Sequence, residues 1–144
     1  MKHYLAIDYG TKFIGLAQFR QGNDPFPLCM ERIANKGASA VFQAIEAIVK
    51  AEEITDIIVG VPYLLDGQIT STSKKMMDFS DQLKAHFNLK KIAITIHQQD
   101  ETLSTFQAQE EMKNSPQFNF KIDMKKIDSV SAKIILQDFL GQKS

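Results

Sequence analysis

The sequence has a single cysteine, no long apolar run and no excess charge of either sign. Cys29 cannot form an internal disulfide and fits a reducing cytosol, and its apolar neighbours predict a core thiol. No stretch approaches the roughly 20 apolar residues that cross a bilayer. Asp8 and Gly10 interrupt the N-terminal segment, so we expect no signal peptide. These absences predict a cytoplasmic protein with no membrane contact.

The charges balance, with 17 basic and 17 acidic residues in 144. A neutral chain does not coat nucleic acid by bulk charge, although a local basic groove remains compatible with this composition. The length suits one domain, and no repeat, low-complexity tract or linker interrupts the chain. We therefore expect residues 1–144 to form a single domain.

Five short apolar segments, several of them bounded by turn-forming residues, predict β-strands. They span residues 4–8, 14–19, 28–33, 57–61 and 91–97. Apolar residues at helical spacing predict four helices, one after the third strand, one after the fourth and two after the fifth. Ser39 and Ser104 are the expected caps of the first and third helices, and the last helix is expected over residues 127–140.

This element order predicts how the strands are arranged. Short connections make the first three strands antiparallel, and right-handed crossovers place the fourth and fifth strands parallel to the first. The expected fold class is α/β, with a mixed five-stranded sheet in the order 3-2-1-4-5 flanked by helices. The same element order is typical of RNase H-like proteins.

Asp8 ends an apolar strand and is followed by a turn at residues 9–12. A charge at that place is costly unless it has a task, and ligand sites of open α/β sheets gather at the carboxyl ends of strands. The alternative is a turn carboxylate that accepts hydrogen bonds from nearby backbone N–H groups.

Two further acids complete a candidate metal site. Glu101 follows the fifth strand, and Asp128 lies in the first turn of the last helix. Asp128 alone is explained by the helix dipole. Together with Asp8, however, the three carboxylates would repel one another unless cations such as Mg²⁺ or Mn²⁺ hold them. Such ions activate water and stabilise the leaving oxygen of a phosphodiester.

The expected strand order leaves one geometric tension. The first and fifth strands would be about 10 Å apart, so Glu101 has to lean inward from its loop. Asp66, after the adjacent fourth strand, competes for the same place, and Asp100 is a second competitor. Because Gly67 follows Asp66, we favour an ordinary turn there.

Six blocks resemble the YqgF (RuvX) family in their order along the chain. They are residues 5–12, 14–17, 58–62, 66–67, 100–105 and 127–140. The resemblance implies an RNase H-like fold related to Holliday-junction resolvases and trimming of precursor 16S ribosomal RNA at its 5′ end. Matched position by position, it implies Asp8, Glu101 and Asp128 as the catalytic and metal-binding acids.

Three positions depart from the family pattern. Phe13 stands where a basic residue is usual, Thr102 replaces an arginine, and Ser131 replaces the first of two alanines. Two missing cations affect phosphate contacts more than metal binding. Lysines elsewhere would supply a replacement groove, and we expect Lys12, Lys125 and Lys126 to contact nucleic acid.

One more side chain and three rival functions complete the expectations. His97 ends the predicted fifth strand, either as a structural residue or as an aid to proton transfer. The first motif also resembles the phosphate loop of actin-like and sugar-kinase ATPases, which need a second lobe. The other rivals are a non-catalytic RNA- or ribosome-binding module and a structure-selective DNA resolvase. The expected partners are precursor ribosomal RNA first, then branched DNA and ribosomal precursor particles.

Overall fold

The computed structural model of the chain describes residues 1–62, 70–100, 104–119 and 121–143. Its strands are β1 (His3–Tyr9), β2 (Phe13–Arg20), β3 (Leu28–Ala34), β4 (Asp56–Val61) and β5 (Thr95–Asp100). They form one sheet in the order β3-β2-β1-β4-β5. The first three strands are antiparallel neighbours, and β4 and β5 run parallel to β1. The predicted fold class and strand order are confirmed.

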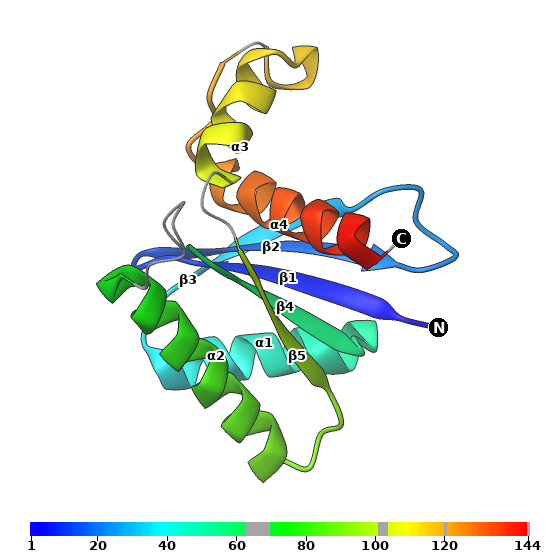
Figure 1. Cartoon of the computed structure of the whole chain (residues 1–144), viewed down its shortest axis with the longest axis vertical. Coiled ribbons are helices and arrows are strands. Elements are labelled where there is room, and N and C mark those ends of the chain that lie inside the picture. Colours follow the sequence, from blue (N-terminus) through cyan, green and yellow to red (C-terminus); the bar gives the residue numbers. More distant parts are fainter. Residues whose placement is uncertain (63–69, 101–103, 120, 144) are drawn as a thin grey trace.

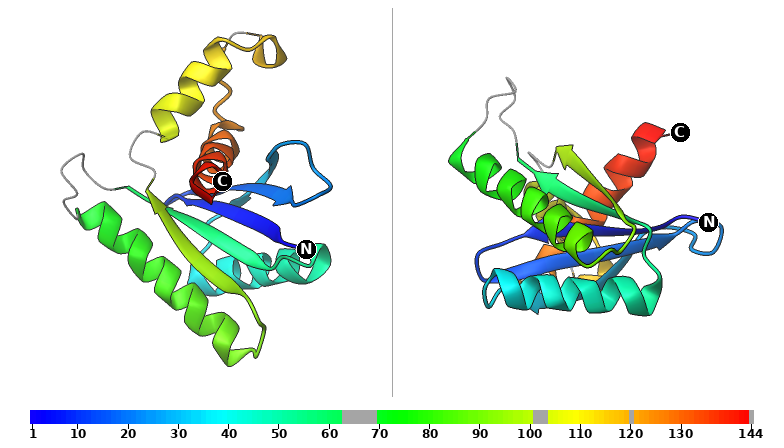
Figure 2. Two further views of the ribbon diagram at one scale, coloured as in Figure 1. Left: turned by 45° about the vertical axis from the view of Figure 1, so that its right-hand side comes forward. Right: turned by 90° about the horizontal axis from the view of Figure 1, so that it is seen from below.

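The helices lie on both faces of this sheet. They are α1 (Ala38–Glu52), α2 (Ser71–Leu89), α3 (Ser104–Lys113), the 3-10 turn η1 (Pro116–Phe118) and α4 (Ile127–Lys143). Helices α1 and α2 cover one face, α4 crosses the other, and α3 stands beyond α4 (Figures 1 and 2). Within the described ranges, no helix combines the length and the apolarity that crossing a bilayer requires.

Alternation along β1 separates the two cores. Leu5 and Ile7 pack toward α1 and α2, whereas Tyr4 and Ala6 pack toward α4. Successive side chains of a strand point to opposite faces, so the α4 face receives every second residue of β1. That face is built from small residues near the carboxyl end of β1, which lets α4 lie close to the sheet.

The fifth strand begins later than predicted. β5 spans Thr95–Asp100 rather than residues 91–97, because its pairing with β4 runs from Asp56 with Thr95 to Val61 with Asp100. Residues 91–94 are the connection from α2, and Lys91 has a left-handed φ of 56°. Their isoleucines still pack on the core, which explains why the apolar pattern starts before the strand does.

Two smaller predictions were wrong. Ser39 does not cap α1, which begins at Ala38 after Gly37 and has no side-chain capping bond. Cys29 is not a core thiol: it lies on the edge strand β3 and is exposed. Its Sγ still donates to the Ser129 carbonyl oxygen at 3.6 Å, and partial desolvation of the thiol on that side raises its pKa.

Candidate active site

Asp8 lies near the carboxyl end of β1, on the face that α4 covers. It continues the alternation of Tyr4 and Ala6, both of which pack against α4. Asp8 is partly exposed, and its cross-strand partner in β2 is Gly15. The small partner leaves room above this part of the sheet for another element.

The first turn of α4 fills that room. A Cβ atom added to Gly15 would lie 2.0 Å from the Asp128 carbonyl oxygen and 2.9 Å from the Asp128 Cβ. Only glycine permits this approach. One residue on, the Leu16 backbone N–H donates to the Ser129 hydroxyl at 3.4 Å. The contact places the Asp128 backbone over the β2 residue that pairs with Asp8.

Two small residues of α4 support the same contact. Ser131 and Ala132 are 1% and 0% exposed, respectively, in the helix–sheet interface. Their small side chains let α4 lie close to the sheet. Gly15 was not singled out from the sequence, although its motif was, because its task is visible only when the helix is in place.

Arg32 of β3 is the second residue that the sequence did not reveal. Its Nη1 atom lies 3.3 Å from Asp128 Oδ2 and 3.2 Å from the Met124 carbonyl oxygen. Its guanidinium carbon lies 3.5 Å from the centroid of the Phe13 ring, in a cation–π contact. The position where a basic residue was expected therefore holds an aromatic ring that supports a cation from the neighbouring strand.

The remaining candidate acids come at or after the ends of β4 and β5 in the sequence. Glu101 and Asp66 lie outside the described residues, and so does Thr102. Asp100 ends β5 opposite Val61 of β4. Among the residues with a described placement, no three His, Cys, Asp or Glu side chains form a group that could hold a metal ion. The described part of the site is thus the pair Asp8 and Asp128.

The three candidate lysines lie in two exposed segments beside this pair. Lys12 is in the turn between β1 and β2, and Lys125 and Lys126 directly precede α4. Gly10 begins the β1–β2 turn, and a Cβ atom there would lie 2.4 Å from the Phe13 carbonyl oxygen. The need for glycine at position 10 comes from the turn itself rather than from an approaching substrate.

His97 is away from the acids. Because β5 begins at Thr95, His97 lies near the amino end of its strand, where its Nε2 atom is 2.9 Å from Asp56 Oδ2. Its ring also packs on Phe139 of α4, with 4.8 Å between centroids. These contacts support the structural role, and the strand register places His97 level with Ala6, two residues before Asp8 and two strands away.

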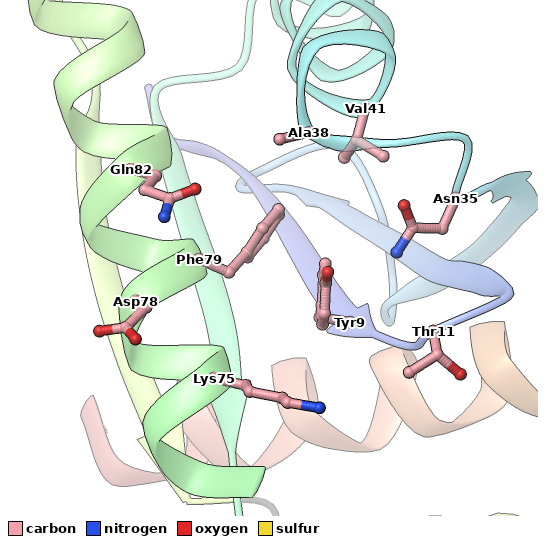
Figure 3. Close-up of a pocket in the computed structure, with 9 residues that line it drawn as sticks. All are labelled: Tyr9, Thr11, Asn35, Ala38, Val41, Lys75, Asp78, Phe79 and Gln82. Carbon is pink, nitrogen blue, oxygen red and sulfur yellow. The ribbon is translucent and has the colours of Figure 1, made fainter. Parts of the chain in front are cut away.

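A cavity of about 340 Å³ opens on the other face of the sheet, behind the acids. Figure 3 shows the Tyr9 ring against Phe79, with Lys75 of α2 extending toward Tyr9. The two ring centroids are 4.4 Å apart. Asn35 closes one side by donating from Nδ2 to the Gly10 carbonyl oxygen at 2.8 Å. Tyr9 and Asp8 point to opposite faces, so this cavity is separate from the acidic pair.

Comparisons with known proteins identify the family of this chain. A family model described as "RuvX: Holliday junction resolvase" matches residues 2–142. A protein of Maridesulfovibrio salexigens named "Putative pre-16S rRNA nuclease" is 35% identical, over 96% of this chain and 97% of its own. One of the same name from Malacoplasma penetrans is 33% identical, over 96% and 94%.

Two solved structures share the fold at low sequence identity. RuvC of T. thermophilus, in complex with a Holliday junction substrate, gives a TM-score of 0.57 at 6% identity, covering 99% of this chain and 96% of that one. The fowlpox virus Holliday junction resolvase gives 0.55 at 10% identity, covering 99% of each chain. At these identities the likeness establishes the RNase H-like fold.

Proposed function

The chain belongs to the RuvX family, and from that premise we propose that it is a metal-dependent endonuclease acting in 5′-end maturation of precursor 16S ribosomal RNA. The name of the relatives at 33–35% identity supports this substrate. The observation that carries the proposal is the contact of Gly15, the cross-strand partner of Asp8, with the backbone of Asp128.

The donor chemistry of the pair fits a hard divalent cation. Asp8 and Asp128 offer carboxylate oxygens, and Mg²⁺ commonly takes one or two carboxylates together with waters and substrate phosphate. We propose Glu101 as the third ligand and Mg²⁺ or Mn²⁺ as the ion. Such an ion would lower the pKa of an attacking water and stabilise charge on the phosphodiester.

The chain's own residues then hold the substrate. Hydrolysis joins a water oxygen to phosphorus, breaks the bond to the leaving oxygen and leaves a proton on that oxygen. We propose that Lys12, Lys125 and Lys126 hold neighbouring phosphates, because all three are exposed beside the acids. Contacts of this kind fix the register of the nucleic acid without reading its sequence.

The direct test is cleavage of two labelled substrates by the pure protein. A precursor 16S 5′-leader fragment and a four-way DNA junction are each incubated with Mg²⁺, Mn²⁺ or chelator. We expect metal-dependent cleavage of the RNA. Cleavage of the junction alone would favour the DNA resolvase that the family description names, and binding without cleavage would favour a non-catalytic RNA-binding module.

A second test addresses the lysines by salt dependence. Alanine at Lys12, Lys125 and Lys126 together should weaken RNA binding and lower the slope of log affinity against log salt by about two to three, since each lost phosphate contact removes close to one unit. Lys50→Ala is a matched control on α1, on the other face of the sheet. An unchanged slope in the triple variant would remove these lysines from the interface.

A further inference from the structure

A groove of about 710 Å³ lies between β3 and the segment that leads into α4. One wall comes from the edge strand and includes Arg32, with Phe13 beneath it. The other wall comes from η1 and the start of α4 and includes Phe118, Lys125 and Lys126. The groove is on the α4 side of the sheet, as the acids are.

Positive charge gathers in this groove. Among the lining residues that the structure describes, Arg32, Lys125 and Lys126 are basic and Glu31 is acidic. The chain as a whole is neutral, so this local excess is a feature of the groove. A concave surface with one sign of charge favours a ligand of the opposite sign.

Two aromatic rings of the groove contact these cations. Lys126 Nζ lies 5.8 Å from the centroid of Phe118, which is partly exposed. The Arg32 guanidinium lies on the Phe13 ring, so its outer plane faces away from that ring. Nucleobases stack on aromatic rings and on guanidinium planes, whereas phosphates are held by lysines. Rings alternating with cations suit a ligand that offers both bases and phosphates.

The groove borders Asp128. Arg32, which lines the groove, contacts Asp128 at 3.3 Å, and Lys126 is two residues ahead of Asp128. A strand with a phosphate at the acids would therefore place its next nucleotides here. In a duplex the bases are stacked within the helix and only phosphates reach such a wall, so stacking requires unpaired nucleotides.

We propose that this groove binds a single-stranded segment of the RNA substrate next to the cleaved phosphodiester, with a base stacked on Phe118 and phosphates held by Lys125 and Lys126. The proposal rests on the nuclease function proposed above and adds the class of substrate: RNA that is unpaired on one side of the cleavage point. Arg32 joins the groove to the acids and offers a second stacking plane.

The test compares single-stranded and hairpin RNA of equal length, measured by fluorescence anisotropy in chelator so that no cleavage occurs. Phe118→Leu should weaken single-strand binding roughly tenfold, the effect of losing one base–aromatic stack, and leave hairpin binding within twofold. Phe26→Leu is the matched control, since Phe26 is 59% exposed in the β2–β3 connection. It should change neither affinity.

Arg32→Lys gives a second measurement that does not depend on the Phe118 packing. It keeps the charge and loses the planar guanidinium, so single-strand affinity should again fall more than hairpin affinity. Equal losses of affinity for both RNAs, or no loss in either variant, would overturn the proposal that the groove binds single-stranded RNA. Because binding is measured without metal, failure of the groove leaves wild-type cleavage intact, whereas failure of the nuclease proposal leaves these affinities measurable.

Discussion

Asp56 and Asp128 lie at opposite ends of the same sheet, and they differ in how completely the protein surrounds them. Asp56 begins β4, where its 2% exposed side chain contacts Lys2, His97 and Thr55 at 3.3, 2.9 and 2.7 Å. The side chain of Asp128 is 32% exposed and contacts Arg32 at 3.3 Å. Asp56 is therefore surrounded by hydrogen-bond donors, whereas part of the Asp128 side chain remains exposed to solvent.

The comparison indicates how an acid that stabilises the fold differs from one that can bind a ligand. Burial opposes ionisation of Asp56, but hydrogen bonds from His97, Thr55 and Lys2 outweigh it and lower the carboxyl pKa. Its charge is therefore used within the fold. Asp128, partly exposed and close to Asp8, can still accept a cation or a substrate contact.

The largest effect is expected from Asp8→Asn, at the end of the sheet where the acids are partly exposed. The amide has nearly the shape of the carboxylate but binds divalent cations more weakly, so cleavage of the RNA should fall about a thousandfold or more. The metal-free variant should be as stable as the wild type or more stable, because one repelling charge is removed. Added Mg²⁺ should raise the melting temperature of the wild type more than that of the variant. Retained cleavage would take Asp8 out of the site, and marked destabilisation would make it a structural turn residue.

The reverse pattern is expected at the enclosed end, from Asp56→Ala. Removing an acid from a buried network leaves its donors unpaired, so the free energy of unfolding should fall by about 3 kcal/mol at pH 7. Urea denaturation measures it, with the exposed Asp81→Ala as control. A loss near zero would show that the contacts around Asp56 contribute nothing to the free energy of unfolding.

The same variant has a predicted pH dependence. The folded-state pKa of Asp56 lies below its ordinary value, so the unfolded chain takes up the proton first as the pH falls. The contribution of Asp56 is therefore complete above about pH 4 and is lost as the pH falls further, through the folded pKa. The gap in stability between wild type and Asp56→Ala should narrow across that window.

Gly15→Ala tests the contact that joins the two catalytic candidates. The added methyl group would collide with the Asp128 backbone, so α4 must shift, and overpacking of this kind costs about 2 kcal/mol. Cleavage should fall as well, because Asp128 moves. Gly141→Ala in the same helix is the control: nothing lies within 4 Å of its added Cβ, and alanine there should stabilise by about 0.5–1 kcal/mol. If both variants were equally stable, the close approach would not exist in solution.

The smallest effect is expected from Asp138→Asn on α4. Asp138 is exposed, but its partial desolvation and the nearby charge of Asp100 raise its pKa, so its ionised form is slightly disfavoured in the folded state. The penalty builds as the pH rises from about 4 through the folded pKa. The variant should gain up to about 0.5 kcal/mol at pH 7 and nothing at pH 3. A gain that persists at pH 3 would need another cause.

The fold followed from local patterns, because alternation and helical spacing are properties of neighbouring residues. The strand order was predicted for that reason, whereas Asp8 and Asp128 became candidates through the motif blocks of the family resemblance. Arg32 was missed because its partners come from distant segments, the β1–β2 hairpin and α4. The misplacement of His97 came from a strand that begins four residues later than its apolar pattern. Pairing with β4, rather than local sequence, sets that start.

The contact of Gly15 with Asp128 has a consequence for the order of events during synthesis. Asp8 and Asp128 are 120 residues apart in the chain, and their segments meet only when α4 docks on the sheet. Contacts between such distant segments form late, since the intervening chain must be ordered first. A nascent chain therefore carries the first acid without the second. If the acids act together, a chain in which α4 has not yet docked on the sheet cannot cut RNA.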